Sequence, residues 1–167
     1  MIRAIVLAAL FSTTACTPIT SQGNTTTLPP VDTVQCHVIE GKADRRCTPG
    51  ALNPDVTQDT IHQTICIKGW TATVRPPVSY TDALKRKQMV QYGETGSLSG
   101  YEEDHEINLG IGGAPYNPAN IWPEPRTDSH PAAEKDKEEV YLQRRVCTGT
   151  VTLAAAQAKM FADWSHS

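Results

Sequence analysis

The predicted fold depends most on one stretch, DHEINLGIGGAPYNPANIW, which runs from Asp104 to Trp122. It starts with an acid and a histidine, continues through a short apolar run, and reaches a Gly-Gly pair. Glycine adopts backbone conformations that other residues avoid, so the pair predicts a tight turn. The chain then returns to Asn120 and an aliphatic residue. We therefore expect one strand over residues 103–109 and a short returning strand over 120–122.

The rest of the chain predicts helices and a second, smaller β-region. Apolar periodicity, capping residues and prolines predict helices over residues 54–63, 82–92, 131–146 and 152–164. Alternating β-branched residues predict strands over 65–67 and 70–74. The sum is an α+β fold with few strands, in which Trp122 belongs to the core.

The first residues predict export from the cytoplasm. MIRAIVLAALFSTTAC carries a charge at Arg3 and then an apolar run that is too short to cross a bilayer as a helix. Residues 1–15 therefore form a predicted signal peptide, and lipidation at Cys16 would follow in a bacterial lipoprotein. Ordinary signal cleavage nearby is the alternative. We expect a lipoprotein anchored to a membrane and facing the periplasm or cell exterior, or otherwise a secreted protein.

The organisation of the mature chain follows from its composition. The segment 16–46 is rich in Thr, Ser, Pro and Gly at its start and predicts a flexible tether that includes a local disulfide. The segment 47–167 is long enough for one folded domain, since the whole chain has 167 residues. We expect this domain to be a monomer.

Four cysteines remain after Cys16, and export predicts that they form two disulfides. Four cysteines allow three connectivities. We favour Cys36–Cys47 as a local link and Cys66–Cys147 as a long-range link between the first and last parts of the domain. The cysteine spacing contains no Cys-x-x-Cys pair, so it gives no sign of a zinc site.

The charge balance limits how the protein could bind nucleic acid. The formal net charge is −3, which disfavours passive binding to a polyanion. Binding would require a local basic patch or a metal ion. Lys85–Lys87 and the pair Arg144-Arg145 are the candidate patches, and a solvated helix face is the alternative interpretation of both.

The stretch around Asp104 resembles the HNH, or His-Me finger, endonuclease superfamily. The shared pattern is an Asp-His pair on a strand, a Gly-Gly turn, an Asn-aliphatic pair at the matching separation, and a following helix. The chain also resembles a bacterial group of small exported HNH-like proteins. The matching segments run from CTPGALNP through ICIKGWTATVRPP, SYTDALKRKQ, GGAPYNPANIWPEP and KDKEE to VCTG and AAQAKMFADW, which covers most of the mature chain. The resemblance implies a ββα-metal unit with additional short helices and a small β-hairpin, held by disulfides.

The resemblance also implies a role for each residue of the pattern. His105 would be the general base, and its unperturbed pKa near neutrality suits that task. Asp104 would bind a single divalent metal ion, Mg²⁺ or Mn²⁺, although a regular strand would point it away from the face of His105. Asn120 would hold the hairpin and His105 in orientation through side-chain hydrogen bonds.

The third position of the metal site is the least defined. The family places a second His or Asn on the helix after the hairpin, and His130 is the candidate by its distance from Asn120. Pro131 follows it, however, and a residue before proline avoids the helical conformation. Lys135, Asp136 and Glu139 are the alternatives, since the KD..E pattern matches the HNH-like group.

The function implied is a metal-dependent endonuclease that hydrolyses DNA, with RNA as a further substrate, without sequence specificity. Arg75 and Arg126 could clamp phosphate, although structural ion pairing explains them equally well. The first alternative is a catalytically inactive HNH-like lipoprotein that acts as a binding or structural module. The second is a hydrolase of another class, which no Gly-x-Ser-x-Gly or His-Glu-x-x-His motif supports.

Overall fold

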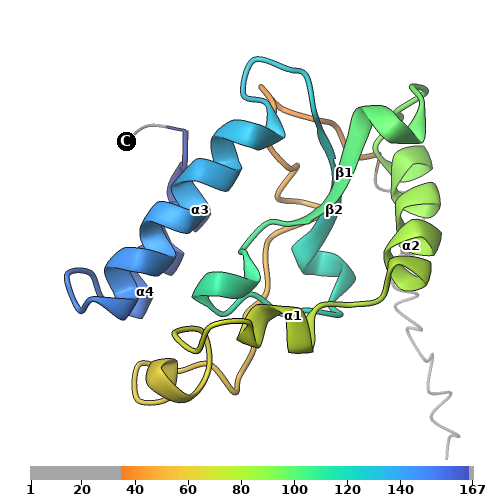
Figure 1. Cartoon of the computed structure of the whole chain (residues 1–167). Coiled ribbons are helices and arrows are strands. Elements are labelled where there is room, and N and C mark those ends of the chain that lie inside the picture. Colours follow the sequence, from red (N-terminus) through yellow and green to blue (C-terminus); the bar gives the residue numbers. More distant parts are fainter. Residues whose placement is uncertain (1–34, 166–167) are drawn as a thin grey trace, which may run out of the picture. The chain divides into compact units, whose positions relative to one another are not determined.

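The fold is built around a two-stranded antiparallel sheet flanked by helices (Figure 1). The computed structural model describes residues 35–165, and all that follows concerns these residues. Strand β1, Tyr101–His105, pairs with β2, Ile121–Pro125, so that His105 lies opposite Ile121. Helix α2, Val78–Gln91, packs against both strands. This arrangement confirms the predicted α+β class and the predicted hairpin.

The other helices lie either on the side of the hairpin opposite α2 or, in the view of Figure 1, below the hairpin. They are α1, Trp70–Val74; α3, Ala132–Cys147; and α4, Leu153–Ala162. Helices α3 and α4 pack on each other and on the loop between the strands, which contains short 3₁₀ turns at Leu109–Ile111 and Pro118–Asn120. The main core cluster joins this loop to the two helices through residues such as Ile107, Ile111, Leu142, Val146 and Met160.

The loop between the strands is held by the buried side chain of Asn120. Its Oδ1 accepts the backbone N–H of Ile107 at 2.9 Å and that of Ala51 at 3.2 Å. Its Nδ2 donates to the carbonyls of Ile107 at 3.0 Å and Ala114 at 3.1 Å. Buried backbone groups cost free energy when they lack a partner, so one amide side chain stabilises four otherwise vulnerable groups.

Both favoured disulfides are present, Cys36–Cys47 and Cys66–Cys147. The second links the segment before α1 to the end of α3 across a sequence separation of 81 residues. Cys36 is fully buried in a second core cluster with Ala43, Tyr92 and Trp122. Residues 36–46 therefore belong to the packed fold, although we expected them in the tether, and Trp122 lies in the core as predicted.

The predicted strands over 65–67 and 70–74 are wrong. Residues 65–67 form turns, and Trp70–Val74 is the short helix α1. Gly69 precedes this helix in the left-handed conformation, with φ of 86°, and Arg75 ends it in an extended conformation, as expected before proline. A strand there would also need a neighbouring strand, and the described chain offers only β1 and β2 in sheets.

The predicted helix over 54–63 is also wrong, apart from one 3₁₀ turn at Ile61–Gln63. Local side-chain hydrogen bonds compete with a helix in this segment. The hydroxyl of Thr60 accepts the N–H of Thr57 at 2.8 Å and donates to the carbonyl of Asp55 at 2.8 Å. Threonine hydroxyls that bond nearby backbone groups favour turns over helix.

Other predicted elements exist with shifted ends. Helix α2 begins at Val78 after Pro77, so Thr81 lies inside it and does not cap it. Strand β1 ends at His105, short of the predicted Leu109. Helices α3 and α4 lie close to the predicted bounds. The signal peptide and Cys16 fall outside the described residues, and within those residues no helix has the length and apolarity needed to cross a membrane.

Gly113→Ala is expected to destabilise the fold strongly. A Cβ at this position would lie 1.6 Å from the carbonyl oxygen of Ile107, which the Asn120 amide holds in place. We expect the free energy of unfolding to fall by more than about 3 kcal/mol, measured by urea denaturation.

Gly100→Ala is the matched control for this substitution. A Cβ there meets no heavy atom within 4 Å, and the backbone φ is not positive. We expect a change below about 0.5 kcal/mol. Equal losses for the two variants would contradict the assigned role of the loop.

Candidate functional site

His105 lies at the end of β1 in a form suited to accept a proton. Its side chain is nearly buried, at 2% exposure, and its Nε2 lies 3.1 Å from the carbonyl oxygen of Pro115. A carbonyl can only accept, so this bond places the ring proton on Nε2 and leaves Nδ1 with a free lone pair. Burial lowers the pKa of His105. The ring is therefore neutral at pH 7.

His105 lines a cavity of about 240 Å³ between the hairpin and two helices. Strand β1 contributes both Asp104 and His105, the last two residues of the strand. Arg75 reaches the cavity from the segment after α1, and Asp136 and Glu139 reach it from α3. The structure thus brings five predicted site residues to one cavity.

A fully buried lysine, Lys135 of α3, lies behind this cavity. Its Nζ donates to Oδ2 of Asp104 and, at 2.9 Å, to the carbonyl of His105. The same ammonium lies 3.0 Å from Oε1 of Glu139 and 3.4 Å from Oε2 of Glu124. Lys135 therefore connects α3 to both strands of the hairpin through charged contacts.

The charge states of this cluster follow from burial and from the single ammonium. Burial opposes the charge of Lys135, but the neighbouring carboxylates of Asp104 and Glu124 raise its pKa well above the ordinary value. Burial likewise opposes the charge of Asp104, but Lys135 lowers its pKa. Burial raises the pKa of Glu139 to about 7 and that of Glu124 well above normal. The resting cluster is thus dominated by one Lys135–Asp104 ion pair.

The cavity holds carboxylates that could bind a divalent metal ion, but the described residues alone form no ready metal site. In the described part of the chain, no three His, Cys, Asp or Glu side chains gather into a ready cage. The cavity nevertheless offers the carboxylates of Asp104, Asp136 and Glu139. Mg²⁺ in phosphoryl sites is commonly bound by one or two carboxylates, water and the substrate phosphate. Asp104 could serve an ion of that kind.

His130 and Arg126 do not reach the cavity. His130 precedes α3, whose first turn follows the extended Pro131, and its Nδ1 lies 3.3 Å from Oε2 of Glu134. Its ring packs edge-on against Trp164. Arg126 forms an exposed ion pair with Glu102. The structure therefore does not bring His130 to the site as the expected third ligand, and of the two arginines only Arg75 is placed to meet a phosphate.

Glu124 belongs to this cluster, although no motif in the sequence predicted it. It lies on β2 two positions after Trp122, and both side chains are buried. Residues two apart on a strand share a face. A buried tryptophan at Trp122 therefore indicated a buried carboxyl group at Glu124, and such a group either pairs with a cation or takes a raised pKa.

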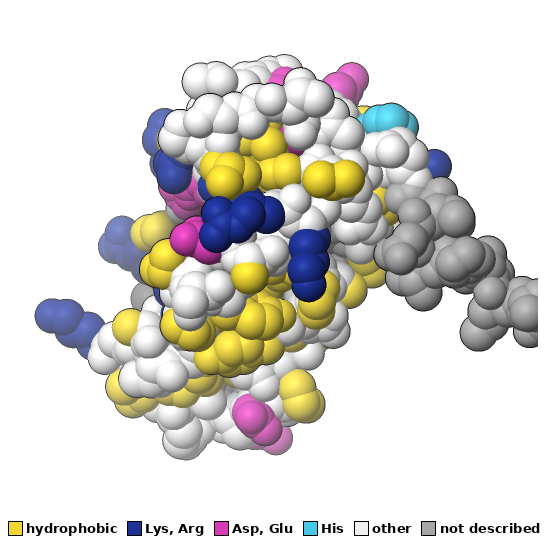
Figure 2. Space-filling view, turned by 90° about the vertical axis from the view of Figure 1, so that its right-hand side faces the viewer, with side chains coloured by type: hydrophobic (Ala, Val, Ile, Leu, Met, Phe, Trp, Pro, Cys, Tyr) yellow, Lys and Arg dark blue, Asp and Glu magenta, His cyan; other side chains and the backbone are white. Residues whose placement is uncertain are grey.

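The basic residues of α2 lie away from this cavity. Figure 2 faces the side of the molecule that carries α2, where Lys and Arg side chains lie among apolar ones. On this helix Arg86 and Lys87 are exposed, whereas Lys85 donates to the carbonyl of Tyr101 at 2.5 Å. None of the three lines the cavity of His105. The predicted basic patch is therefore a helix face beside the hairpin and no part of the candidate site.

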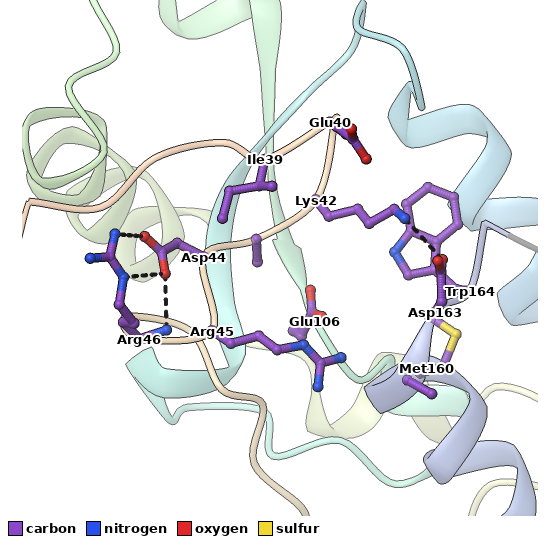
Figure 3. A pocket seen from close by; sticks show the side chains of 12 residues that line it. Ile39, Glu40, Lys42, Asp44, Arg45, Arg46, Glu106, Met160, Asp163 and Trp164 are labelled. Atoms are coloured by element: carbon purple, nitrogen blue, oxygen red, sulfur yellow. Dashed lines mark hydrogen bonds and ion pairs between the residues drawn. The ribbon is translucent and has the colours of Figure 1, made fainter.

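A second cavity, of about 430 Å³, contains neither His105 nor Asp104 (Figure 3). Its charged groups largely pair with each other, because Lys42 lies 3.0 Å from Asp163 and Arg46 lies 2.6 Å from Asp44. Glu106, which follows His105, lines this cavity. His105 and Glu106, which are adjacent in the sequence, thus line two different cavities.

Comparisons of the chain with protein-family models, with curated proteins and with solved structures found no match. The resemblance to HNH endonucleases therefore stays a prediction that rests on the motif residues.

Glu103→Gln is expected to change how stability depends on pH. Both carboxylate oxygens of Glu103 are buried without a partner, and burial raises its pKa to about 8, against the opposing effect of Lys85. A carboxyl with a raised folded-state pKa contributes stability below pH 4.5 and loses that contribution as the pH rises through about 8. Glu103→Gln has no ionisable group at this position, so its stability does not fall in this way as the pH rises.

The measurement is the free energy of urea unfolding between pH 4.5 and 9 for both proteins. The wild type should lose roughly 3 kcal/mol relative to Glu103→Gln over this interval, after allowance for partial exposure. The exposed Asp59→Asn is the matched control and should run parallel to the wild type. Parallel curves for Glu103→Gln would contradict the assignment.

Proposed function

We propose that the protein is a metal-assisted endonuclease of the HNH type that hydrolyses phosphodiester bonds in DNA and also accepts RNA. The observation that carries the proposal is the placement of neutral His105 and ionised Asp104 on one cavity together with Arg75. The order β1, glycine-rich loop, β2 and α3 supports it, since a ββα-metal unit has the same succession of elements.

The chain's own residues account for most of the chemistry. Nδ1 of His105 would take a proton from water, and the oxygen of that water would attack phosphorus as one P–O bond breaks. The bond from Nε2 to Pro115 fixes the ring in the tautomer that this step needs. Arg75 would attract the phosphate into the cavity. A Mg²⁺ or Mn²⁺ ion on Asp104 would supply neutralisation of charge on the phosphate and leaving oxygen.

We also propose that the protein is exported and held at a membrane by lipid on Cys16. The two disulfides are compatible with an oxidising compartment outside the cytoplasm. Non-specific cleavage suits the absence of a basic recognition arm or helix at the described cavity.

The alternative is a binding or structural module without catalysis. The near-complete burial of His105 favours it, because a base must reach its water. The position of His105 in the wall of a cavity supports the nuclease instead, because water can enter that cavity. The two functions differ in one decisive property, the turnover of nucleic acid.

The test is cleavage of plasmid DNA and of RNA by the full-length chain with both disulfides formed. We expect cleavage with Mg²⁺ or Mn²⁺ and none with EDTA. His105→Ala should lower the rate at least about 100-fold, the usual contribution of a general base. His62→Ala, which changes an exposed histidine elsewhere, should cleave like the wild type.

Absence of cleavage by folded protein with either metal would remove the nuclease proposal and favour the binding module. Full activity in His105→Ala would show that another residue acts as the base.

A further inference from the structure

We propose that Lys135 is the resident cation of the candidate site, so that the free protein holds no divalent metal and acquires one only together with a phosphodiester. This inference rests on the proposed function for the identity of the ligand. It makes Lys135 a positioning residue, which acts through Asp104 and does not itself touch the substrate.

The contacts of Lys135 are those of a site already filled by a cation. Its side chain is 0% exposed, and its ammonium is surrounded by oxygen atoms from β1, β2 and α3. Asp104 and Glu139, which also line the cavity, both contact this ammonium. Carboxylates that already share a cation attract a second one less strongly.

The buried position keeps the ammonium of Lys135 in contact with these carboxylates. A lysine on a surface could swing away and leave its carboxylates to a metal ion. Lys135 has no such freedom, because the whole side chain lies inside the fold and Nζ also donates to the carbonyl of His105 at 2.9 Å. Breaking a buried ion pair leaves uncompensated charge, so displacement of the ammonium is unfavourable.

The free side of the site then lacks enough ligands for a metal alone. Oδ2 of Asp104 is bound to Lys135, and no cage of three protein ligands exists among residues 35–165. Mg²⁺ and Mn²⁺ prefer six oxygen ligands, and phosphate oxygens can complete such a shell. Arg75 on the same cavity would bring the phosphate there. Metal and substrate would therefore bind together.

The experiment follows free Mn²⁺ by electron paramagnetic resonance with the full-length chain and both disulfides formed. With Mn²⁺ alone, we expect no loss of the free-ion signal. With Mn²⁺ and a phosphorothioate DNA duplex, which resists cleavage, we expect about one additional ion per chain to bind, as one metal site requires. DNA alone, and DNA with Asp104→Asn, give the background and should lack this additional ion.

Lys135→Met tests whether the ammonium of Lys135 is what prevents the free protein from binding a metal ion. It removes the charge from a side chain of similar length, so Asp104 and its neighbours lose their cation. The folded variant should bind Mn²⁺ without DNA and gain thermal stability from it. Lys137→Met, an exposed change on the same helix, should respond like the wild type. If Lys135→Met does not fold, the wild-type titrations decide alone.

Three results would overturn the inference. The first is that the free wild type binds Mn²⁺ and that Asp104→Asn abolishes this binding. The second is that no additional ion binds in the presence of DNA, and the third is that folded Lys135→Met does not bind Mn²⁺. None of these depends on turnover. A nuclease that cleaves but binds metal in its free form contradicts only this inference, whereas an inactive protein contradicts the proposed function.

Discussion

The carboxamide of Asn120 is the interaction on which the site depends. It bonds four backbone groups from three segments. The backbone carbonyl of Asn120 also accepts the N–H of Glu106 at 2.8 Å. The side-chain bonds join the end of the loop between β1 and β2 to its start at Ile107, to Ala114 within it, and to Ala51. They therefore fix the carbonyl of Pro115, to which the His105 ring is bonded. The tautomer of a candidate base is thus set by a residue that never touches the cavity.

Electrostatics explains why acids crowd around His105. The hairpin carries Asp104 and Glu124 to the buried face that α3 covers, and one ammonium from α3 meets them there. A buried ion pair contributes little to stability, because the cost of desolvating both charges offsets their attraction. What the pair contributes is position, because Lys135 holds Asp104 at the cavity while Glu139 faces the same space.

Local patterns in the sequence were enough for the hairpin, α3, α4 and both disulfides. The glycine turn needs only Gly113 and its neighbours. Cysteine parity and the expected export predict two disulfides, and the structure has the favoured one of the three possible pairings. The helix α1 was missed because WTATV alternates like a strand, and only the lack of a neighbouring strand excludes that conformation. The contacts of Lys135 with the hairpin could not be predicted in the same way, because Glu124 and Asp104 lie 11 and 31 residues away in sequence. Only Glu139, four residues after Lys135, lies within reach of a local pattern.

The site residues also divide into those that a local motif predicts and those whose position depends on contacts far apart in sequence. Asp104, His105 and Asn120 form part of one contiguous motif, so their positions follow from the hairpin alone. Arg75 and Arg126 differ only in tertiary environment: one lines the cavity and the other pairs with Glu102. His130 failed as a site residue because Pro131 starts α3 after it and leaves its ring against Trp164.

The chemistry proposed for the site depends on His105 being a neutral ring that carries its proton on Nε2 and none on Nδ1. Long-range proton–nitrogen NMR of the histidine side chains tests this protonation state, with His105→Ala to assign the resonance. The account predicts a proton on Nε2 only at pH 7, and a pKa below the ordinary 6.5 because of burial. A proton on Nδ1 at that pH, in a neutral or a charged ring, would contradict it.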